Sequence, residues 1–204
     1  MNQFKDKVVL ITGAGKGSGR ILAQAFAEQG AIVAANDISP INVEEVVDQI
    51  LARGGRAQAY IDDIAKKVAA QNIINQVEDD FGHIDILINH AAVEPRVPLL
   101  DMDEWDWHRV LDVNLTGTFF MTQSAGRVMR AQGRGVIINL MTGSSPEEDG
   151  KAAFIASMNG VAGLTRQAAR ELSPYGIKVY LVENISGQII ANVFALLDLQ
   201  IEEK

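Results

Sequence analysis

The sequence alternates short apolar runs with longer stretches of helical spacing, and this alternation constrains the fold more than any other feature. The short runs predict six strands, at 8–12, 31–36, 57–61, 84–89, 135–141 and 177–182. The longer stretches predict helices near 18–29, 41–53, 66–81, 101–132 (as two helices) and 151–173. Continuous apolar strands between helices are typical of a parallel sheet that is covered on both faces. We therefore expect an α/β fold, with residues 1–204 as a single domain built on one doubly wound parallel sheet.

The composition narrows the classes of partner. The 204 residues include 18 basic and 26 acidic side chains, for a formal charge of −8, and no cysteine. The acidic excess argues against a nucleic-acid surface or an anionic membrane as partner. The lack of cysteine, and histidines without ligand spacing, predict no metal site. No apolar run approaches the ~20 residues that span a bilayer, and no signal-peptide layout is seen, so we expect a cytoplasmic location.

The first predicted strand runs into a glycine-rich segment, TGAGKGSG at 12–19. Glycines let the chain turn tightly and let its backbone approach a pyrophosphate closely. The next helix begins here, so its free N–H groups face the phosphates. A plain turn between strand and helix is the alternative interpretation. The segment favours a Rossmann-type dinucleotide-binding domain, whose phosphate loop consists of Gly13, Gly15, Lys16, Gly17, Ser18 and Gly19.

Asp37 closes the second predicted strand, AIVAAND. A carboxylate at this place accepts hydrogen bonds from a ribose 2′-hydroxyl and repels a 2′-phosphate. We therefore expect NAD (NADH) as cofactor rather than NADP. Lys16 is a mild counter-signal, because a cation in the loop could meet a phosphate. The alternative role of Asp37 is to cap the turn or helix that follows in SPINVEE.

Further segments complete a resemblance to a known family. They are YIDDIA with Asp63, NHAA at 89–92, DVNLTGTFF at 112–120, GRGVIINLMTG and ARELSPYGIKV. With the glycine segment, they make residues 5–182 resemble the short-chain dehydrogenase/reductases, in particular 3-oxoacyl-carrier-protein reductase-like members. The resemblance implies that Asp63 contacts the adenine amino group, and that Asn114 and Thr142 stand at the positions of the catalytic asparagine and serine. It adds further cofactor-site residues, namely Ile64, Asn89 and Ala91.

The chain departs from the family in AAFIASMNG, 152–160. In the family, a tyrosine there is the general acid or base at the substrate carbonyl, and a lysine four residues later lowers its pKa and holds the nicotinamide ribose. These positions are Phe154 and Met158, which lack the hydroxyl and the charge. Losing a positioned acid–base group typically costs ~10²–10⁴ in rate. His90 also replaces a second asparagine, and Ala92 a glycine.

Other groups could replace the missing proton donor. Thr142 still carries a hydroxyl, and His90 titrates in the right range, although a loop histidine bonded to backbone is the favoured interpretation. Lys151 is expected to be solvated and Tyr175 to lie too far away. Asn114 has an alternative structural role, which is to bridge backbone groups where its helix is irregular.

After the sixth predicted strand, the family continues with a substrate lid and a last strand. Here Glu183 and Asn184 lead almost at once to ISGQII, 185–190, which resembles the approach to that strand, so the lid is expected to be largely missing. The tail that follows, ANVFALLDLQIEEK, has residues 190, 193, 194, 197 and 201 on one helical face, although GQIIANV could be a strand. The tail could pack on its own sheet, and the resemblance implies a homodimer or homotetramer.

Three functions follow. The first is an NAD(H)-binding pseudoenzyme with weak or no hydride transfer, acting as a sensor, a scaffold or a partner subunit. The second is an active NAD-dependent oxidoreductase on a hydroxyl or carbonyl substrate of unknown identity, with Thr142, His90 or water as proton donor. The third is a fold that has lost nucleotide binding.

Overall fold

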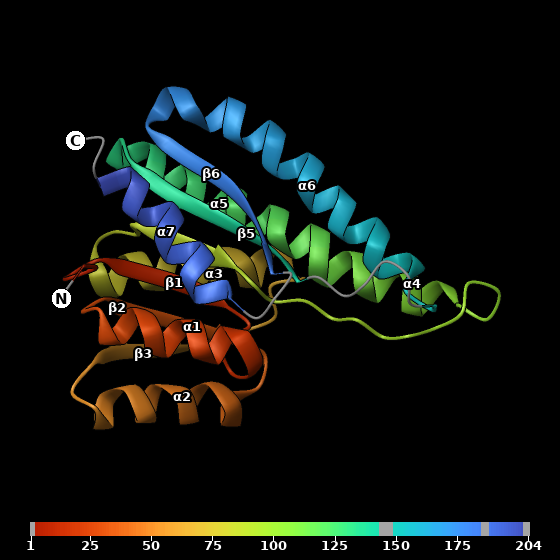
Figure 1. The fold of residues 1–204 in the computed structure, drawn as a ribbon, viewed down its shortest axis with the longest axis horizontal. Coiled ribbons are helices and arrows are strands. Elements are labelled where there is room, and N and C mark those ends of the chain that lie inside the picture. The colour runs from red at the N-terminus through yellow and green to blue at the C-terminus, as the bar shows by residue number, and fades with distance from the viewer. Residues whose placement is uncertain (1–2, 143–148, 185–187, 202–204) are drawn as a thin grey trace.

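The six strands form one parallel sheet in the order β3-β2-β1-β4-β5-β6 (Figure 1). The structure is a computed structural model that describes residues 3–142, 149–184 and 188–201, without the side chains of residues 142, 184 and 198–201. The strands are β1 (Val8–Thr12), β2 (Ile32–Asp37), β3 (Arg56–Ile61), β4 (Ile86–Asn89), β5 (Gly135–Thr142) and β6 (Ile177–Asn184). The expected doubly wound parallel sheet is confirmed.

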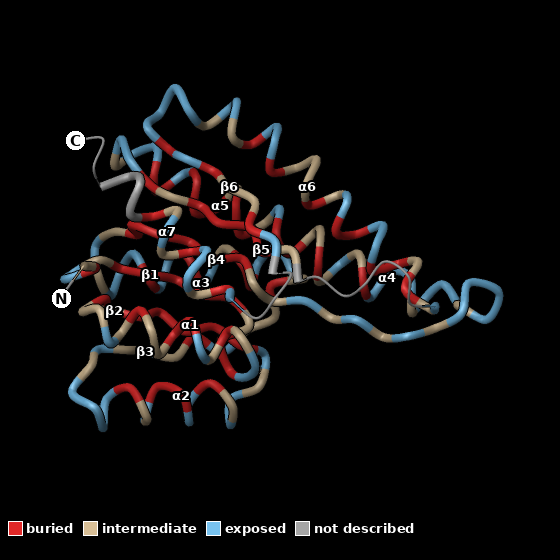
Figure 2. The backbone as a smooth tube through the Cα atoms, in the orientation of Figure 1, coloured by how far each residue is buried: buried red, intermediate tan, exposed pale blue. Residues whose placement is uncertain are grey.

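Helices cover both faces of this sheet, as the continuous apolar strands predict. The helical elements are α1 (Gly17–Glu28), α2 (Pro40–Ala52), α3 (Lys67–Phe81), α4 (Glu104–Leu111), the π-helix η1 (Asp112–Gly117), α5 (Thr118–Gln132), α6 (Ala152–Leu172), the 3₁₀ turn η2 (Ser173–Tyr175) and α7 (Ile189–Ile201). One apolar core joins the sheet to α1, α2 and α7, and a second joins it to α3, α5 and α6. Figure 2 shows the central strands buried between these two layers.

The strand order reverses direction between β1 and β4, which are direct neighbours in register Leu10↔Leu87. In open parallel sheets, ligands bind beyond the carboxyl ends of the strands at such a reversal. The loop after β1 and the loop after β4 therefore border the expected ligand site.

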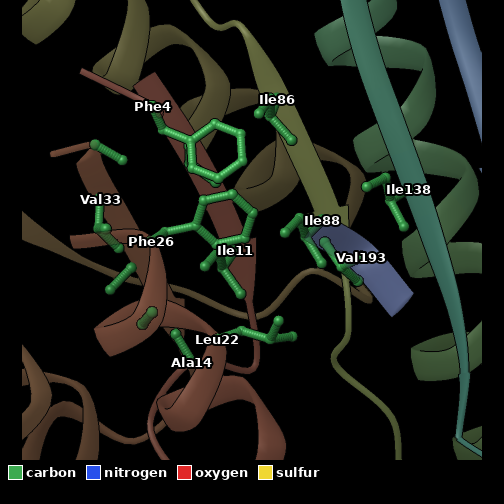
Figure 3. Close-up of a cluster of buried hydrophobic side chains, with 14 of the residues drawn as sticks. Phe4, Ile11, Ala14, Leu22, Phe26, Val33, Ile86, Ile88, Ile138 and Val193 are labelled. Atoms are coloured by element: carbon green, nitrogen blue, oxygen red, sulfur yellow. The ribbon is translucent and has the colours of Figure 1, made fainter. Parts of the chain in front are cut away.

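The chain end folds back as a helix, not as a strand. Val193 and Leu197 of α7 are buried in the first core, where Val193 lies near Ile88 and Ile138 (Figure 3). The Phe194 ring contacts those of Phe4 and Phe26, with centroids 5.1 and 4.9 Å away. The alternative in which GQIIANV forms a strand is wrong, because an apolar helical face meets an aromatic surface on its own sheet.

Residues 185–188 alone separate β6 from α7. This length leaves no room for a substrate lid between them, in agreement with the expected deletion. Every other predicted strand and helix overlaps its observed counterpart, and the predicted pair at 101–132 is α4 and α5 with η1 between them. Within the described part of the chain, no helix has the length and apolarity that a bilayer crossing requires.

Candidate functional site

The glycine loop, residues 12–19, turns sharply after β1 against the end of β4. Gly13 has φ 66°, and an added Cβ there would lie 2.8 Å from the Cα of Ala91. The Gly15 N–H donates to Oδ2 of Asp37 at 2.9 Å, and a Cβ on Gly15 would lie 2.8 Å from the same oxygen. A side chain at either position would push the loop away from its neighbours. The sequence correctly placed this loop between a strand and a helix.

The loop leads directly into the first turn of α1, which offers its N–H groups outward. Lys16 is the exposed N-cap residue and makes no side-chain cap, and Gly17 is exposed. A Cβ on Gly17 would meet nothing within 4 Å, so space lies beside the backbone here. Ser18 is half-buried and Gly19 is buried. Uncapped N–H groups and the positive end of a helix fit a diphosphate.

Asp37 and Asp63 follow the carboxyl ends of the neighbouring strands β2 and β3. Asp37 is 8% exposed; besides Gly15, it accepts a hydrogen bond from the Ser39 N–H at 2.9 Å. Ser39 is the N-cap residue of α2, so Asp37 caps the turn before this helix and not the helix itself. Asp63 accepts from the Ala65 N–H at 3.0 Å, and Ile64 is buried against Gly117 of η1. Both carboxylates keep lone pairs that their observed bonds do not use.

Thr12 ties the end of β4 to the glycine loop. Its hydroxyl oxygen accepts the N–H groups of His90 and Ala91 at 3.0 and 3.1 Å. Asn89, just before them, is buried and donates to Oδ1 of Asn139 at 2.8 Å. Ala91 is half-buried beside Gly13. Sequence reasoning missed Thr12, although its place as the first residue of TGAGKGSG could have indicated it.

The His90 imidazole lies beneath the glycine loop. Its Nε2 is 2.8 Å from the Ser18 hydroxyl, and its Nδ1 is buried against the Gly13 backbone. Burial lowers the pKa of this imidazole below its usual value, although the backbones of Gly13 and Thr12 and the Asp37 carboxylate act in the opposite direction. The ring therefore meets the Ser18 side chain at one nitrogen and lies against the backbone of the glycine loop at the other. The expectation of a ring bonded to backbone and the predicted role of His90 as substitute proton donor both stay predictions.

Asn114 takes the structural role that the sequence left open. It lies in η1, where the helix is widened to a π-helix, and is 1% exposed. Its side chain accepts the Val93 N–H at 2.8 Å and donates to the Val93 carbonyl at 3.0 Å. It also donates to the Ser157 hydroxyl of α6 at 3.0 Å. Asn114 thus holds the loop after β4 against α6, and Ser157 is a second residue that sequence reasoning missed.

Phe154 and Met158 are buried, with 4% and 5% of their surface exposed. They form an apolar site cluster whose other members are Val93, Met102, Val110, Ala153 and Met141. The cluster brings together the loop after β4, helices α4 and α6 and the end of β5. The Thr142 side chain, expected at the serine position, lies outside the described residues. At the two positions that the resemblance gives to a tyrosine and a lysine, the structure therefore has a buried phenyl ring and a buried thioether.

Lys151 and Glu94 form an ion pair beside this cluster, with Nζ 2.7 Å from Oε1. The Lys151 side chain is 1% exposed and that of Glu94 is 30% exposed. The adjacent Gly150 carbonyl accepts the Val97 N–H at 2.9 Å, so the loop after β4 is joined to the start of α6 at two points. The prediction that Lys151 is solvated is wrong, because the loop covers it. Glu94 has no signal in the sequence beyond its place in that loop.

Comparisons with known proteins agree with this geometry. The family model described as short chain dehydrogenase matches residues 7–186. The dehydrogenase subunit BbsD of Thauera aromatica is 39% identical over 179 residues, which are 88% of this chain and 72% of that protein. The 3-oxoacyl-(acyl-carrier-protein) reductase FabG of Staphylococcus epidermidis is 38% identical over 87% of this chain and 73% of its own. A crystal structure of a metagenomic short-chain oxidoreductase in complex with NADP has a TM-score of 0.88 and 30% identity, covering 96% of this chain and 91% of that one.

Proposed function

The chain belongs to the short-chain dehydrogenase/reductase family of oxidoreductases, and from this premise we propose that it binds NAD(H) but transfers hydride weakly or not at all. The observation that carries the proposal is the contrast between two neighbouring regions. The glycine loop keeps the shape and open N–H groups of a nucleotide site, whereas the apolar site cluster occupies the place of the acid–base pair. The nicotinamide supplies the hydride when it is bound, so the chain must supply the proton.

Nucleotide binding is supported by residues at the ends of four adjacent strands. We assign the diphosphate to the N–H groups of residues 15–19, the adenosine to Asp37, Asp63 and Ile64, and the nicotinamide side to Asn89 and Ala91. Asp37 favours NADH, since a 2′-phosphate beside a buried carboxylate would meet an uncompensated negative charge. We take residues 1–204 as one dinucleotide-binding domain around this site.

Impaired catalysis is supported by the surroundings of Phe154 and Met158. Asn114 keeps its place beside α6, but its amide is occupied by Val93 and Ser157. Phenylalanine cannot give or take a proton, and methionine cannot lower a neighbouring pKa by charge. A protein with this site could serve as a sensor, a scaffold or a partner subunit of a complete homologue.

The binding test is a titration with NADH and with NADPH, followed by NADH fluorescence and by thermal shift. Bound nucleotide should stabilise the fold by RT ln(1 + [L]/Kd), about 2.7 kcal/mol at a hundredfold excess over Kd. NADH should bind more tightly than NADPH, and Asp37→Asn should narrow that difference. If neither nucleotide binds, the proposal fails; if NADPH binds more tightly, the role given to Asp37 fails.

The activity test screens ketones and alcohols with the unmodified protein and with the double variant Phe154→Tyr, Met158→Lys. We expect no measurable turnover from the unmodified protein and a gain of at least about tenfold over the detection limit from the double variant. A matched control is Phe154→Leu, Met158→Leu, which alters the same positions without adding a proton donor. Turnover by the unmodified protein at ~1–10³ per second would instead indicate an active oxidoreductase that uses Thr142, His90 or water as proton donor.

A further inference from the structure

The His90 ring occupies a space that two glycines leave open. A Cβ on Gly13 would lie 3.1 Å from Nδ1, and a Cβ on Gly19 would lie 2.7 Å from the same atom. The ring reaches from the end of β4 to the first turn of α1, where Nε2 meets the Ser18 hydroxyl at 2.8 Å. These glycines therefore make room for an imidazole as well as for a nucleotide. Ser18 stands among the N–H groups to which we assign the diphosphate.

We propose that His90 is a positioning residue of the nucleotide site, which acts through the Ser18 hydroxyl so that binding of the dinucleotide diphosphate is coupled to uptake of a proton by the imidazole. The inference rests on the proposed nucleotide binding. In this role His90 acts through Ser18 and makes the affinity for the nucleotide depend on pH.

The hydrogen-bond chemistry of the pair gives the coupling its direction. A neutral imidazole with its proton on Nδ1 accepts the Ser18 O–H at Nε2, which leaves only oxygen lone pairs of Ser18 for a ligand. A protonated imidazole donates from both nitrogens, so Nε2–H donates to Ser18 and the hydroxyl proton becomes available to a phosphate oxygen. When the neutral ring carries its proton on Nδ1, beside the Gly13 backbone, protonation therefore converts Ser18 from an acceptor to a donor for a bound anion.

The electrostatic surroundings act in the same direction. In the ligand-free protein, burial lowers the His90 pKa, so the ring is neutral at neutral pH. Among the described residues, the charged group that acts on the ring is Asp37 at the end of β2; β1 with the loop after it contributes the uncharged Thr12 and Gly13, and α1 contributes Ser18 and Gly19. A bound diphosphate adds negative charge beside the ring and raises its pKa. By linkage, the affinity for the nucleotide rises as the pH falls.

The test measures the NADH dissociation constant from about pH 8 to about pH 5.5 by calorimetry, in buffers that differ in ionisation enthalpy. NADH suits the purpose because it lacks the 2′-phosphate of NADPH, which titrates near pH 6. We expect the affinity of the unmodified protein to rise about three- to tenfold over this range, the effect of a pKa rise of up to about one unit. We also expect uptake of a fraction of a proton per nucleotide near pH 6.

Two variants remove the two members of the pair, and a third is the control. His90→Asn should lose the dependence of the NADH affinity on pH, whatever its affinity at pH 8. Ser18→Ala should bind more weakly and reduce the dependence to below about twofold. His108→Gln removes an exposed histidine of α4, whose side chain is 58% exposed, and should keep the full dependence.

Each outcome decides the inference. The coupling is overturned if the NADH affinity of the unmodified protein does not change with pH. It is also overturned if His90→Asn or Ser18→Ala keeps the full dependence of NADH affinity on pH. In each case nucleotide binding itself stays intact. The Ser18→Ala arm carries the test if His90→Asn does not fold. Failure of the unmodified protein to bind NADH at any pH would be a failure of the proposed function, which the first titration at pH 8 reveals.

Discussion

At the scale of single residues, His90 makes the ligand-free protein sensitive to acid. Burial lowers its pKa below the value of about 6.5 for an imidazole in the unfolded chain. Between the two pKa values the unfolded chain binds more protons, so the free energy of unfolding falls as the pH drops below about 6.5 and is fully retained above it. We expect the free energy of unfolding, measured with urea in the absence of nucleotide, to fall less from pH 7.5 to pH 5.5 in His90→Asn than in the unmodified protein.

The other two histidines provide the comparison for this experiment. His108 lies exposed on α4, and His83 pairs with Asp85 at 3.1 Å at the opposite edge of the sheet. His108→Gln should therefore lose as much stability on acidification as the unmodified protein does. An equal loss in His90→Asn would show that the buried His90 imidazole does not cause the effect.

At positions 154 and 158, the side chains that could transfer a proton differ from those that stabilise the fold, Phe154 and Met158. Burying each of these side chains contributes ~1.5–3 kcal/mol of hydrophobic stabilisation. A lysine at position 158 would enter a cluster in which every described member is apolar, and it would need a new partner for its charge. Apolar side chains at positions 154 and 158 therefore stabilise this part of the fold, whereas the proposed proton-handling pair would destabilise it.

At the scale of secondary-structure elements, Asn114 joins three of them. It bonds both backbone groups of Val93 after β4, lies in η1, and donates to Ser157 on α6. Asn114→Ala would remove both bonds to the Val93 backbone in a partly buried region, at a cost of about 1–3 kcal/mol in the free energy of unfolding. Urea unfolding measures this cost.

The matched substitution is Asn159→Ala on the same helix as Ser157. Asn159 is exposed and bonds only the carbonyl of Ile155, one turn earlier, among the contacts that the described residues show. We expect a change within about 0.5 kcal/mol. Equal losses for the two variants would contradict the bridging role of Asn114.

Strands and helices were predictable from the sequence because local patterns carry them. Apolar runs of strand length fixed β1 to β6, and helical spacing fixed the helices between them. The tail was ambiguous because GQIIANV has both β-branched residues and a helical face. Its outcome depends on Phe4 and Phe26, whose aromatic surface lies far away in the sequence and accepts a helix that carries Phe194.

At the scale of the whole molecule, the sequence predicted which segments meet but not which side chains pair. Strand order follows from topology, so the glycine loop, Asp37 and the segment 89–91 were expected at one edge of the sheet, as the structure has them. The pairs Lys151–Glu94 and His90–Ser18 were missed, because each links a loop to a helix that is distant in sequence. Such contacts depend on the path of a loop, for which local sequence has no periodic signal.

The surface between α5 and α6 is a candidate contact between two copies of the chain. A groove of about 250 Å³ lies between these helices, and Tyr175 is among the residues that line it. Tyr175 follows the end of α6 opposite to Phe154, as predicted. Phe119 on its wall is 40% exposed. The groove also carries Arg127 and Glu171, so two copies related by a two-fold axis can pair opposite charges across it. We propose that this face forms the homodimer contact that the family resemblance implies.

Light scattering coupled to size exclusion tests this contact on the intact chain, whose mass is 22.1 kDa. We expect the unmodified protein to elute as a dimer or tetramer and Phe119→Arg to elute as a monomer. The substitution brings two like charges together at the contact and removes apolar area from it. Ile41→Arg is the matched control, since Ile41 is 77% exposed on α2, on the other side of the sheet. Its assembly should not change. A monomeric unmodified protein, or a Phe119→Arg variant that keeps the mass of the assembly, would rule out this face as the contact.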